Sequence, residues 1–439
     1  MMSGLPTPPG ANNSHPIALW FIFWGEFAER CSFYGSRAIM VLYMTEQLGI
    51  SKQDAGTYYF TYKMGCYFLP LLGGYLADRY FGKYWTIVGF TIPYIIGQFL
   101  LTIPDITFLL LSLALLAAGS GVIKPNISAL LGLTYDQKRP GNLTLRANAF
   151  LWFYFSINVG SLLSMLALPF VREKYGYQVA FAIPAILMIL ALGAFALGKP
   201  FYAVDTPGPA PVLPPEERKQ QRKVIISLLG VFALIVLFWI PYEHNDSLWV
   251  LFAKEHMDMS TPWLASLGGP ANLPPDSLQW VNALMVLVLI IFFQWFWPRF
   301  DPKSQISPIS KMFVGFLFTA SAPGIMTLCA WMVQGGDVKV SHMWLVLAYV
   351  LLTIGEVLVY GTGLDFSFGQ APASMKSLIT SCFLVTNAIA NLINIFWMRT
   401  YENGLSSLSF YGIATLLPLI GAVAILFVGR QFMTKKPQQ

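Results

Sequence analysis

Long apolar stretches alternate with short polar or Gly/Pro-containing segments along the whole chain. About twenty apolar residues in a helix suffice to cross the hydrocarbon core of a bilayer. The pattern therefore predicts an all-α integral membrane protein. The spans expected on this basis are 17–45, 54–80, 84–103, 106–131, 143–171, 177–199, 223–256, 276–298, 310–334, 341–369, 376–399 and 407–430.

Composition supports a membrane protein, and the basic residues give its orientation. Hydrophobic residues make up 56% of the chain and charged residues 11%, against about a quarter charged in soluble proteins. An even number of spans puts both termini on one side. Lys and Arg concentrate in the loops on that side, which predicts cytoplasmic termini in a plasma membrane, such as a bacterial inner membrane. The net charge of +6 then reflects topology and does not indicate a nucleic-acid partner.

A proline-rich and charged segment divides the predicted spans into two groups of six. Residues 200–222 contain five prolines in 207–215 followed by the run EERKQQRK, which is typical of a linker. The first residues lack the basic start and cleavable apolar core of a signal peptide. The expected organisation is a cytoplasmic tail (1–16), a six-helix bundle (17–199), the linker (200–222), a second six-helix bundle (223–430) and a cytoplasmic tail (431–439).

The first predicted span carries four charged residues, Glu26, Glu29, Arg30 and Arg37. A charged side chain at the centre of a membrane helix costs roughly 2.5–3.5 kcal/mol on insertion scales, so such residues generally face a protein interior or a wet cavity. At about 100° per residue, these four positions share one helical face with Tyr34. We expect this face to line a cavity.

The segment after the second span reads GGYLADRYFGKYWTI, residues 73–87. Its glycines, including Gly74, allow close helix approach and a tight turn. Asp78, Arg79 and Lys83 can form a charged cytoplasmic latch. This segment resembles the loop signature of the major facilitator superfamily, which implies twelve transmembrane helices in two six-helix bundles.

The charged stripe itself, Glu26-Phe-Ala-Glu29-Arg30-Cys-Ser-Phe-Tyr34, resembles the ExxER motif of the proton-dependent oligopeptide transporter family. Three further segments agree with that family in their places along the chain: GSGVIKPN (119–126), FLWFYFSINVGSL (150–162) and WIPYEHNDSLW (239–249). With Gly355-Glu356, the resemblance covers nearly the whole chain. The linker is too short for the accessory helix pair found in many bacterial members, so none is expected.

The resemblance implies a role for individual polar residues in holding a peptide. Arg37 and Lys124 align with the cations that hold the peptide carboxylate, and Glu356 with the acid that receives its amino terminus, assisted by Asn158 and Asn282. Tyr34 and Tyr67 align with tyrosines of the cavity. A zwitterionic peptide needs opposite charges at its two ends, and such pairs count for more in a low-dielectric cavity.

The same resemblance implies how protons are coupled to transport. Glu26, Glu29 and Arg30 form the expected coupling cluster. Glu243 aligns with an acidic position that pairs with Arg37, so protonation of Glu243 would release Arg37, while Lys124 and Glu356 would form a corresponding pair.

Several residues depart from the family pattern or add to it. Cys31 and Phe33 stand at positions where the family motif has other aromatic residues. A tryptophan common in the family is replaced near Cys382. Lys63 lies four residues before Tyr67 and either enters the cavity as a third cation, or snorkels or pairs with a neighbouring acid. His244 is interpreted as a hydrogen-bonded polar residue or as a proton-exchanging group. Asp246 and Asp365 are predicted as gate or packing partners. All four cysteines fall in spans and suggest packing rather than disulfides or metal binding.

The functional prediction is a proton-coupled symporter of di- and tripeptides that works by alternating access, acts as a monomer and needs no cofactor or metal. A transporter of the same fold with a non-peptide substrate, such as a drug, nitrate or a modified amino acid, stays open. The sequence shows no nucleophile–base pair or phosphate-binding loop, so we do not expect an enzyme.

Overall fold

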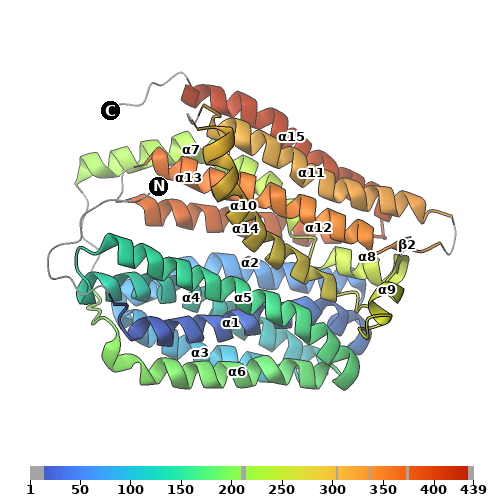
Figure 1. Ribbon diagram of the computed structural model, residues 1–439, viewed down its shortest axis with the longest axis horizontal. Helices are drawn as coiled ribbons and strands as arrows, with labels where there is room; N and C mark the ends of the chain where they lie inside the picture. Colours follow the sequence, from blue (N-terminus) through green and yellow to red (C-terminus); the bar gives the residue numbers. More distant parts are fainter. Residues whose placement is uncertain (1–13, 209–213, 303–304, 336–337, 372–374, 434–439) are drawn as a thin grey trace. The chain divides into compact units, whose positions relative to one another are not determined.

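The structure is a computed structural model that describes residues 14–208, 214–302, 305–335, 338–371 and 375–433. Most of both predicted tails, residues 1–13 and 434–439, and residues 209–213 of the predicted linker lie outside the described residues. The described chain is almost entirely helical (Figure 1). Nine of its helices are long and apolar enough to cross a membrane. Helices α1, α2 and α3 complete the predicted twelve spans, and α1 carries the four charges.

The helices follow the predicted spans closely. They are α1 (Ala18–Leu42), α2 (Lys52–Leu76), α3 (Lys83–Leu100), α4 (Ile106–Lys138), α5 (Leu143–Tyr175), α6 (Tyr177–Leu197), α7 (Pro215–Tyr242), α8 (Leu248–His256), α9 (Pro262–Ala265), α10 (Trp280–Phe300), α11 (Pro308–Met332), α12 (Met343–Glu356), α13 (Thr362–Gly369), α14 (Lys376–Met398) and α15 (Ser407–Met433). Short π-helical turns follow three of them: η1 (Tyr43–Gln47), η2 (Ala77–Phe81) and η5 (Val357–Gly361).

One predicted span is broken in the structure. The hydropathy pattern predicts a single helix over 223–256, but α7 ends at Tyr242 and α8 begins at Leu248. Pro241 removes a backbone donor, and the side chains of Asn245 and Ser247 bond the carbonyl oxygens of Tyr242 and Glu243 at 2.5 and 3.4 Å. These local bonds compete with the helix. The break therefore presents Glu243, His244 and Asp246 from a turn instead of a regular helix.

Helix α7 also begins earlier than expected, at Pro215 rather than at 223. Proline is favoured in the first turn of a helix because its missing donor is not needed there. Glu216 and Glu217 follow in the same turn, where the helix dipole favours negative charge. The charged run EERKQQR is thus the polar start of a membrane helix.

Contacts between residues group the chain into two compact units. Unit 1 comprises Met1–Ile39 and Gly65–Pro211, and unit 2 comprises Met40–Met64 and Val212–Gln439. In unit 1, α3 packs against α4 and α6, and α5 packs against α4 and α6. Close approach depends on small residues, as in other membrane helix pairs: a Cβ at Gly160 of α5 would lie 2.8 Å from the carbonyl oxygen of Phe27 on α1.

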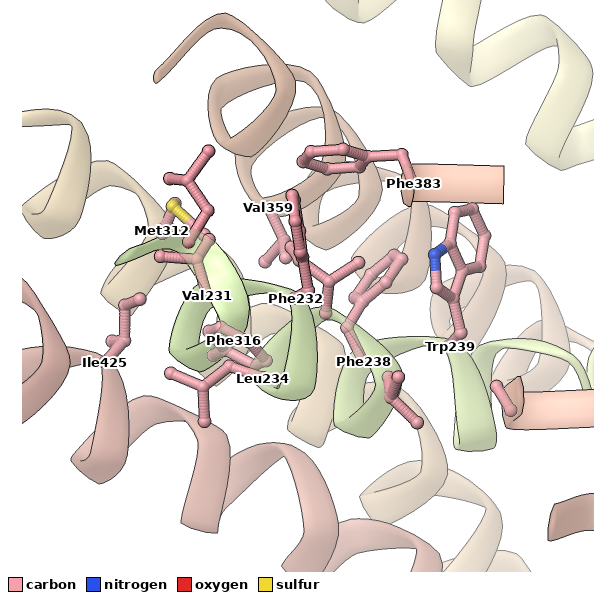
Figure 2. Close-up of a cluster of buried hydrophobic side chains, with 14 of the residues drawn as sticks. Val231, Phe232, Leu234, Phe238, Trp239, Met312, Phe316, Val359, Phe383 and Ile425 are labelled. Carbon is pink, nitrogen blue, oxygen red and sulfur yellow. The ribbon is translucent and has the colours of Figure 1, made fainter. Parts of the chain in front are cut away.

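In unit 2, α11 packs against α12 and α15, and α7 packs against α14 and α15. Large apolar side chains fill the space among them, including Phe232 and Phe238 of α7, Phe316 of α11 and Phe383 of α14 (Figure 2). Two short strands, β1 (Met257–Asp258) and β2 (Val340–Ser341), form a parallel pair. The apolar cluster follows α7 as far as Ile240, three residues before Glu243.

Candidate functional site

The charged stripe of α1 forms a buried ion cluster. Glu26, Glu29 and Arg30 are each no more than 2% exposed. Arg30 Nε lies 3.2 Å from Glu26 Oε1, and the Arg30 guanidinium also pairs with Glu29. The hydroxyl of Ser120 on α4 donates to Glu29 Oε1 at 3.3 Å. Two carboxylates share one guanidinium here, so a proton bound by either carboxylate changes the charge of the whole cluster.

The place of this cluster depends on the contact between α1 and α5. Gly160 lets the backbone of α5 approach α1 beside Arg30, and the thiol of Cys31 donates to the Gly160 carbonyl at 3.2 Å. Cys31 therefore packs against α5 where the two helices approach closely, in the packing role predicted for it. Phe33, the other departure from the motif, is buried.

Two further cations of unit 1 lie against aromatic rings. The Arg37 guanidinium carbon lies 4.7 Å from the Tyr34 ring centroid and 5.4 Å from that of Phe33. Lys124 Nζ lies 5.2 Å from the Tyr67 ring centroid. An aromatic face stabilises a cation by about 0.5–2 kcal/mol. The predicted substrate cations and tyrosines thus occur in adjacent pairs.

Asn158, the fifth predicted substrate residue of unit 1, is buried on α5. Its side-chain amide donates to the carbonyl oxygen of Tyr154, one turn earlier in the same helix, at 2.8 Å. This bond sets the orientation of the Asn158 amide group, including its side-chain oxygen.

In unit 2 the two residues predicted to receive a peptide amino terminus, Asn282 and Glu356, contact each other. Asn282 of α10 donates to Glu356 Oε2 at 3.1 Å and to Thr353 Oγ1 at 2.9 Å, both on α12. Glu356 is the last residue of α12, directly before the π-helical turn η5. Such turns often occur at functional sites. Asn282, which the sequence predicts to assist Glu356, contacts it here, and the role of both residues toward a substrate stays a prediction. Sequence reasoning did not identify Thr353.

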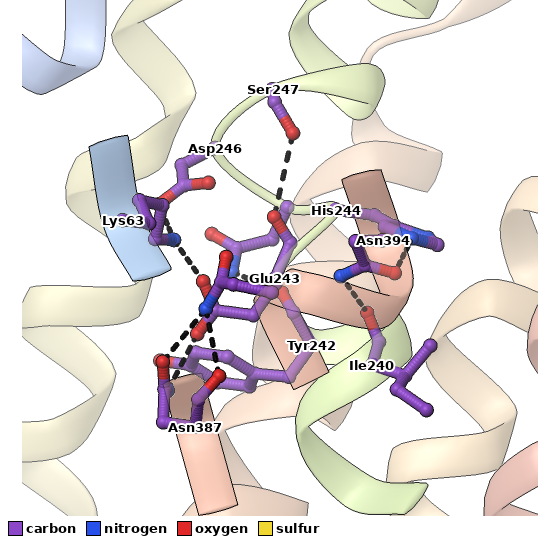
Figure 3. Close-up of polar contacts among 11 residues, drawn as sticks. Lys63, Ile240, Tyr242, Glu243, His244, Asp246, Ser247, Asn387 and Asn394 are labelled. Atoms are coloured by element: carbon purple, nitrogen blue, oxygen red, sulfur yellow. Dashed lines mark hydrogen bonds and ion pairs between the residues drawn. The ribbon is translucent and has the colours of Figure 1, made fainter. Parts of the chain in front are cut away.

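The break between α7 and α8 contains a second buried ion cluster (Figure 3). Lys63 Nζ of α2 lies 2.8 Å from Asp246 Oδ2 and also pairs with Glu243. Asn387 of α14 donates to Glu243 Oε1 at 2.8 Å. All three charged residues are no more than 2% exposed. Of the alternatives for Lys63, the structure therefore supports pairing with neighbouring acids.

His244, in the same turn, is a buried imidazole whose Nε2 lies 3.1 Å from Asn394 Oδ1. The amide nitrogen of Asn394 donates to the Ile240 carbonyl at 3.0 Å. This is the hydrogen-bonded role considered for His244.

Sequence reasoning missed the asparagines of α14. Asn387, Asn391 and Asn394 are spaced i, i+4 and i+7 in a largely apolar helix, so they share one face. All three are buried, and two of them contact Glu243 and His244. That spacing was the signal that could have indicated a polar face of α14 next to Glu243 and His244.

The signature loop, residues 73–87, contains an ion network in unit 1. Lys83 Nζ lies 3.1 Å from Asp78 Oδ1 and 3.2 Å from Asp205 Oδ2, and Asp205 also accepts from the Lys83 backbone at 2.8 Å. Gly82 permits the turn with a φ of 73°. Burial lowers the pKa of Lys83, but its bonds to Asp78 and Asp205 outweigh this effect and raise the pKa above its usual value. Asp205, which sequence reasoning did not single out, ties the segment after α6 to this loop.

The last predicted residues to be placed are Arg79, Asp365 and Gly74. Arg79 and Asp365 are exposed. A Cβ placed on Gly74 would meet no neighbouring atom within 4 Å, so this glycine is not needed for close helix approach. The predicted pairs Arg37–Glu243 and Lys124–Glu356 each join a residue of unit 1 to one of unit 2. They stay predictions.

Comparisons with known proteins agree with this fold. The sequence model of the POT family matches residues 84–214 and 214–415. The crystal structure of the POT family transporter PepTSo superimposes with a TM-score of 0.83 at 26% identity, over 96% of this chain and 99% of that chain. A mutant of peptide transporter POT in complex with alafosfalin gives a TM-score of 0.82 at 27% identity, over 95% and 96%.

Curated relatives include a bacterial and a fungal transporter. The uncharacterized transporter YclF of Bacillus subtilis is 26% identical over 94% of this chain and 93% of its own. The peptide transporter PTR2 of Saccharomyces cerevisiae is 28% identical over 86% of this chain and 73% of its own. The fold and these relatives define a membrane transporter of the major facilitator type. Within that class, the chain belongs to the POT family.

Proposed function

We propose that this protein is a proton-coupled symporter that imports di- and tripeptides. The observation that carries the proposal is the placing of two cations against tyrosine rings in unit 1 and of a hydrogen-bonded carboxylate in unit 2. Unit 1 presents Arg37 and Lys124 against tyrosine rings, and unit 2 presents Glu356 held by Asn282. Cations suit a peptide carboxylate and the acid suits an amino terminus. Recognition through the termini is common to all peptides and so tolerates many side chains.

In this mechanism Arg37 and Lys124 hold the carboxylate, and Glu356 holds the amino terminus with help from Asn158 and Asn282. Tyr34 and Tyr67 contribute ring faces. The substrate lies in a low-dielectric environment, where charge-assisted hydrogen bonds are strong and geometrically selective. The relatives support peptide transport, since PTR2 is a peptide transporter.

Proton coupling is assigned to Glu26, Glu29 and Arg30, together with Glu243. The three residues of α1 share one buried network, so protonation of a carboxylate weakens the hold on Arg30 and biases the equilibrium between outward- and inward-facing states. Glu243 acts with Arg37 in the same cycle. We further propose that the protein acts as a monomer in a bacterial inner membrane with both termini in the cytoplasm, as the distribution of Lys and Arg predicts.

Transport by the purified protein in liposomes tests this proposal. Dialanine uptake driven by an imposed proton gradient, with free alanine as the matched control, is the direct measurement. We expect accumulation of dialanine only when the outside is acidic. Uptake of alanine but not of dialanine, or of neither, would favour a non-peptide substrate of the same fold.

A further inference from the structure

The connection between α8 and α10 carries the most exposed large apolar side chain of the described residues. Leu267 is 78% exposed, and Trp263, four residues earlier, is 61% exposed. The helical turn of α9 continues between them, since the Ser266 amide donates to the Pro262 carbonyl at 3.0 Å. Residues four apart in such a turn share one face. An apolar face exposed in this way generally marks an interaction surface.

This face is presented on an ordered tip. Thr261, which is fully buried, donates from its backbone nitrogen to the Ala271 carbonyl at 2.7 Å and from its hydroxyl to the Pro270 carbonyl at 2.8 Å. These bonds join the two sides of the connection below the tip. Residues 262–269 therefore form a closed loop whose side chains have a defined direction.

One glycine in the tip separates the apolar side chains that face inward from those that face outward. A Cβ at Gly269 would lie 2.6 Å from Leu264 Cγ. Leu264 consequently folds back onto the turn and is half-buried, whereas Trp263 and Leu267 stay exposed. No described part of the chain covers these two side chains.

The absence of charge distinguishes this connection from the others on its side of a twelve-span chain. Residues 259–275 contain no Asp, Glu, Lys, Arg or His. Each of the other connections on that side has a charged residue in the loop or in the adjoining helical turn: Glu46, Asp105, Lys174, Lys339 and Glu402 are examples. A segment without charge has no ion to desolvate at the edge of a bilayer, where tryptophan is enriched.

The bilayer is also the apolar surface next to this connection. Helix α10, which follows the connection, is the least buried of the nine candidate spans. It exposes Ile291 and Trp295, which lipid covers in a membrane. Figure 1 draws α9 at the same end of unit 2 as α8 and β2. The connection thus leaves one membrane helix and enters another at the same boundary, and its apolar face continues the lipid-facing side of α10.

We propose that the tip, residues 262–269, inserts Trp263 and Leu267 into the membrane interface and anchors the α8–α10 connection to the lipid surface. The partner of this apolar face is the bilayer, and not a second protein or another part of this chain. The indole ring lies among the ends of the acyl chains, and its N–H bonds the hydrated headgroups. The anchor is independent of the substrate and of proton coupling.

Spin labelling of the protein in liposomes tests the anchor. The native cysteines are buried or half-buried, so Leu267→Cys adds an exposed thiol, and labelled wild type measures the background. Oxygen concentrates in hydrocarbon and a nickel chelate stays in water, so the ratio of their collision rates with the label reports its depth. This ratio should be several-fold higher at 267 than in Asn403→Cys, an exposed position in the connection between α14 and α15 on the same side.

Two results at position 267 would overturn the proposal. Collisions with the nickel chelate as frequent as at 403 would place the tip in water. Low collision rates with both reagents would show that protein covers the tip.

Trp263→Phe gives a second measurement that needs no new thiol and keeps an aromatic ring. The variant should lose part of the tryptophan fluorescence that brominated lipids quench, and none of the part that aqueous iodide quenches. Loss of iodide-quenched fluorescence instead would mean that Trp263 faces water, against the anchor.

Discussion

Asn282 donates a hydrogen bond to Glu356 across the contact of α10 with α12, at 3.1 Å from Nδ2 to Oε2. The bond fixes the carboxylate proposed to receive the amino terminus of a peptide. Asn282 is therefore a positioning residue whose effect on binding can be measured.

Asn282→Leu should raise the KM for dialanine about 10- to 150-fold, because the loss of a hydrogen bond to a charged group costs roughly 1.5–3 kcal/mol. The maximal rate should change much less. Thr353→Val, which removes the other acceptor of Asn282, should have a smaller effect. If KM rose and the maximal rate fell to the same extent, and did so in both variants, Asn282 would have a structural role instead.

Glu29→Gln should separate peptide movement from its driving force. Counterflow of labelled dialanine needs no net proton movement, so it should persist, whereas gradient-driven accumulation should fall at least tenfold. The physical reason is that Gln cannot take up a proton while it still accepts the Ser120 hydrogen bond seen at Glu29. Accumulation at the wild-type level would contradict the assignment of Glu29 to coupling.

Gly160→Ala should destabilise the protein by about 1–3 kcal/mol, the usual cost of overpacking. Its Cβ would lie 2.8 Å from the Phe27 carbonyl oxygen and 3.3 Å from Arg30 Cβ. Gly193→Ala is the matched control, since nothing lies within 4 Å of its Cβ position, and it should be neutral or stabilising by up to about 1 kcal/mol. Thermal unfolding in detergent measures both. Equal midpoints for the two variants would show that α1 and α5 can move apart freely.

Lys52 should make stability depend on alkaline pH. Its Nζ lies 2.6 Å from Glu255 Oε2 and 2.9 Å from Glu402 Oε2. Burial lowers the pKa of Lys52, but the two carboxylates outweigh this and raise it above its usual value. A raised pKa gives a stabilising effect that is complete below the unfolded value of about 10.4 and is lost as the pH rises through the folded value.

The difference in unfolding temperature between the wild type and Lys52→Met should thus be constant near neutral pH and shrink above about pH 10. Because the groups are partly exposed, the effect should be only about 1 kcal/mol and weaker in high salt. Lys219→Met, an exposed lysine at the start of α7, is the control. A difference that persists at alkaline pH would mean that packing of the Lys52 stem, and not its charge, stabilises the fold.

Asp205 should stabilise the signature loop through two kinds of bond. Asp205→Asn keeps an acceptor for the Lys83 backbone donor, and Asp205→Ala removes it. The Ala variant should therefore speed hydrogen exchange at the Lys83 amide more than the Asn variant, by a factor that corresponds to about 1–2 kcal/mol. The same exchange rate in both variants would assign the effect to charge alone.

Sequence patterns predicted most of the fold because membrane helices must satisfy their own backbone bonds and cover them with apolar side chains. The expected spans agree with the helices within a few residues at most ends. The span 223–256 was the main error. Hydropathy does not register that Pro241, Asn245 and Ser247 favour local bonds over the helix, so it gave no sign of the turn that presents Glu243 and Asp246.

Candidate residues could be named from motifs, but their partners could not. The neighbours Glu26, Glu29 and Arg30 were predictable together because they lie one turn apart on one helix. Lys63 and Asp246 are 183 residues apart, and nothing in the spacing of either relates them.

The sequence by itself therefore determined the class of protein, most of the helices and the charged stripe of α1, because each of these follows from local composition and helical period. Only the tertiary structure decided which charges neutralise one another. Pairing depends on helix contacts between distant segments, such as that of α2 with the α7–α8 break, and on the cost of leaving any charge uncompensated in a medium of low dielectric constant.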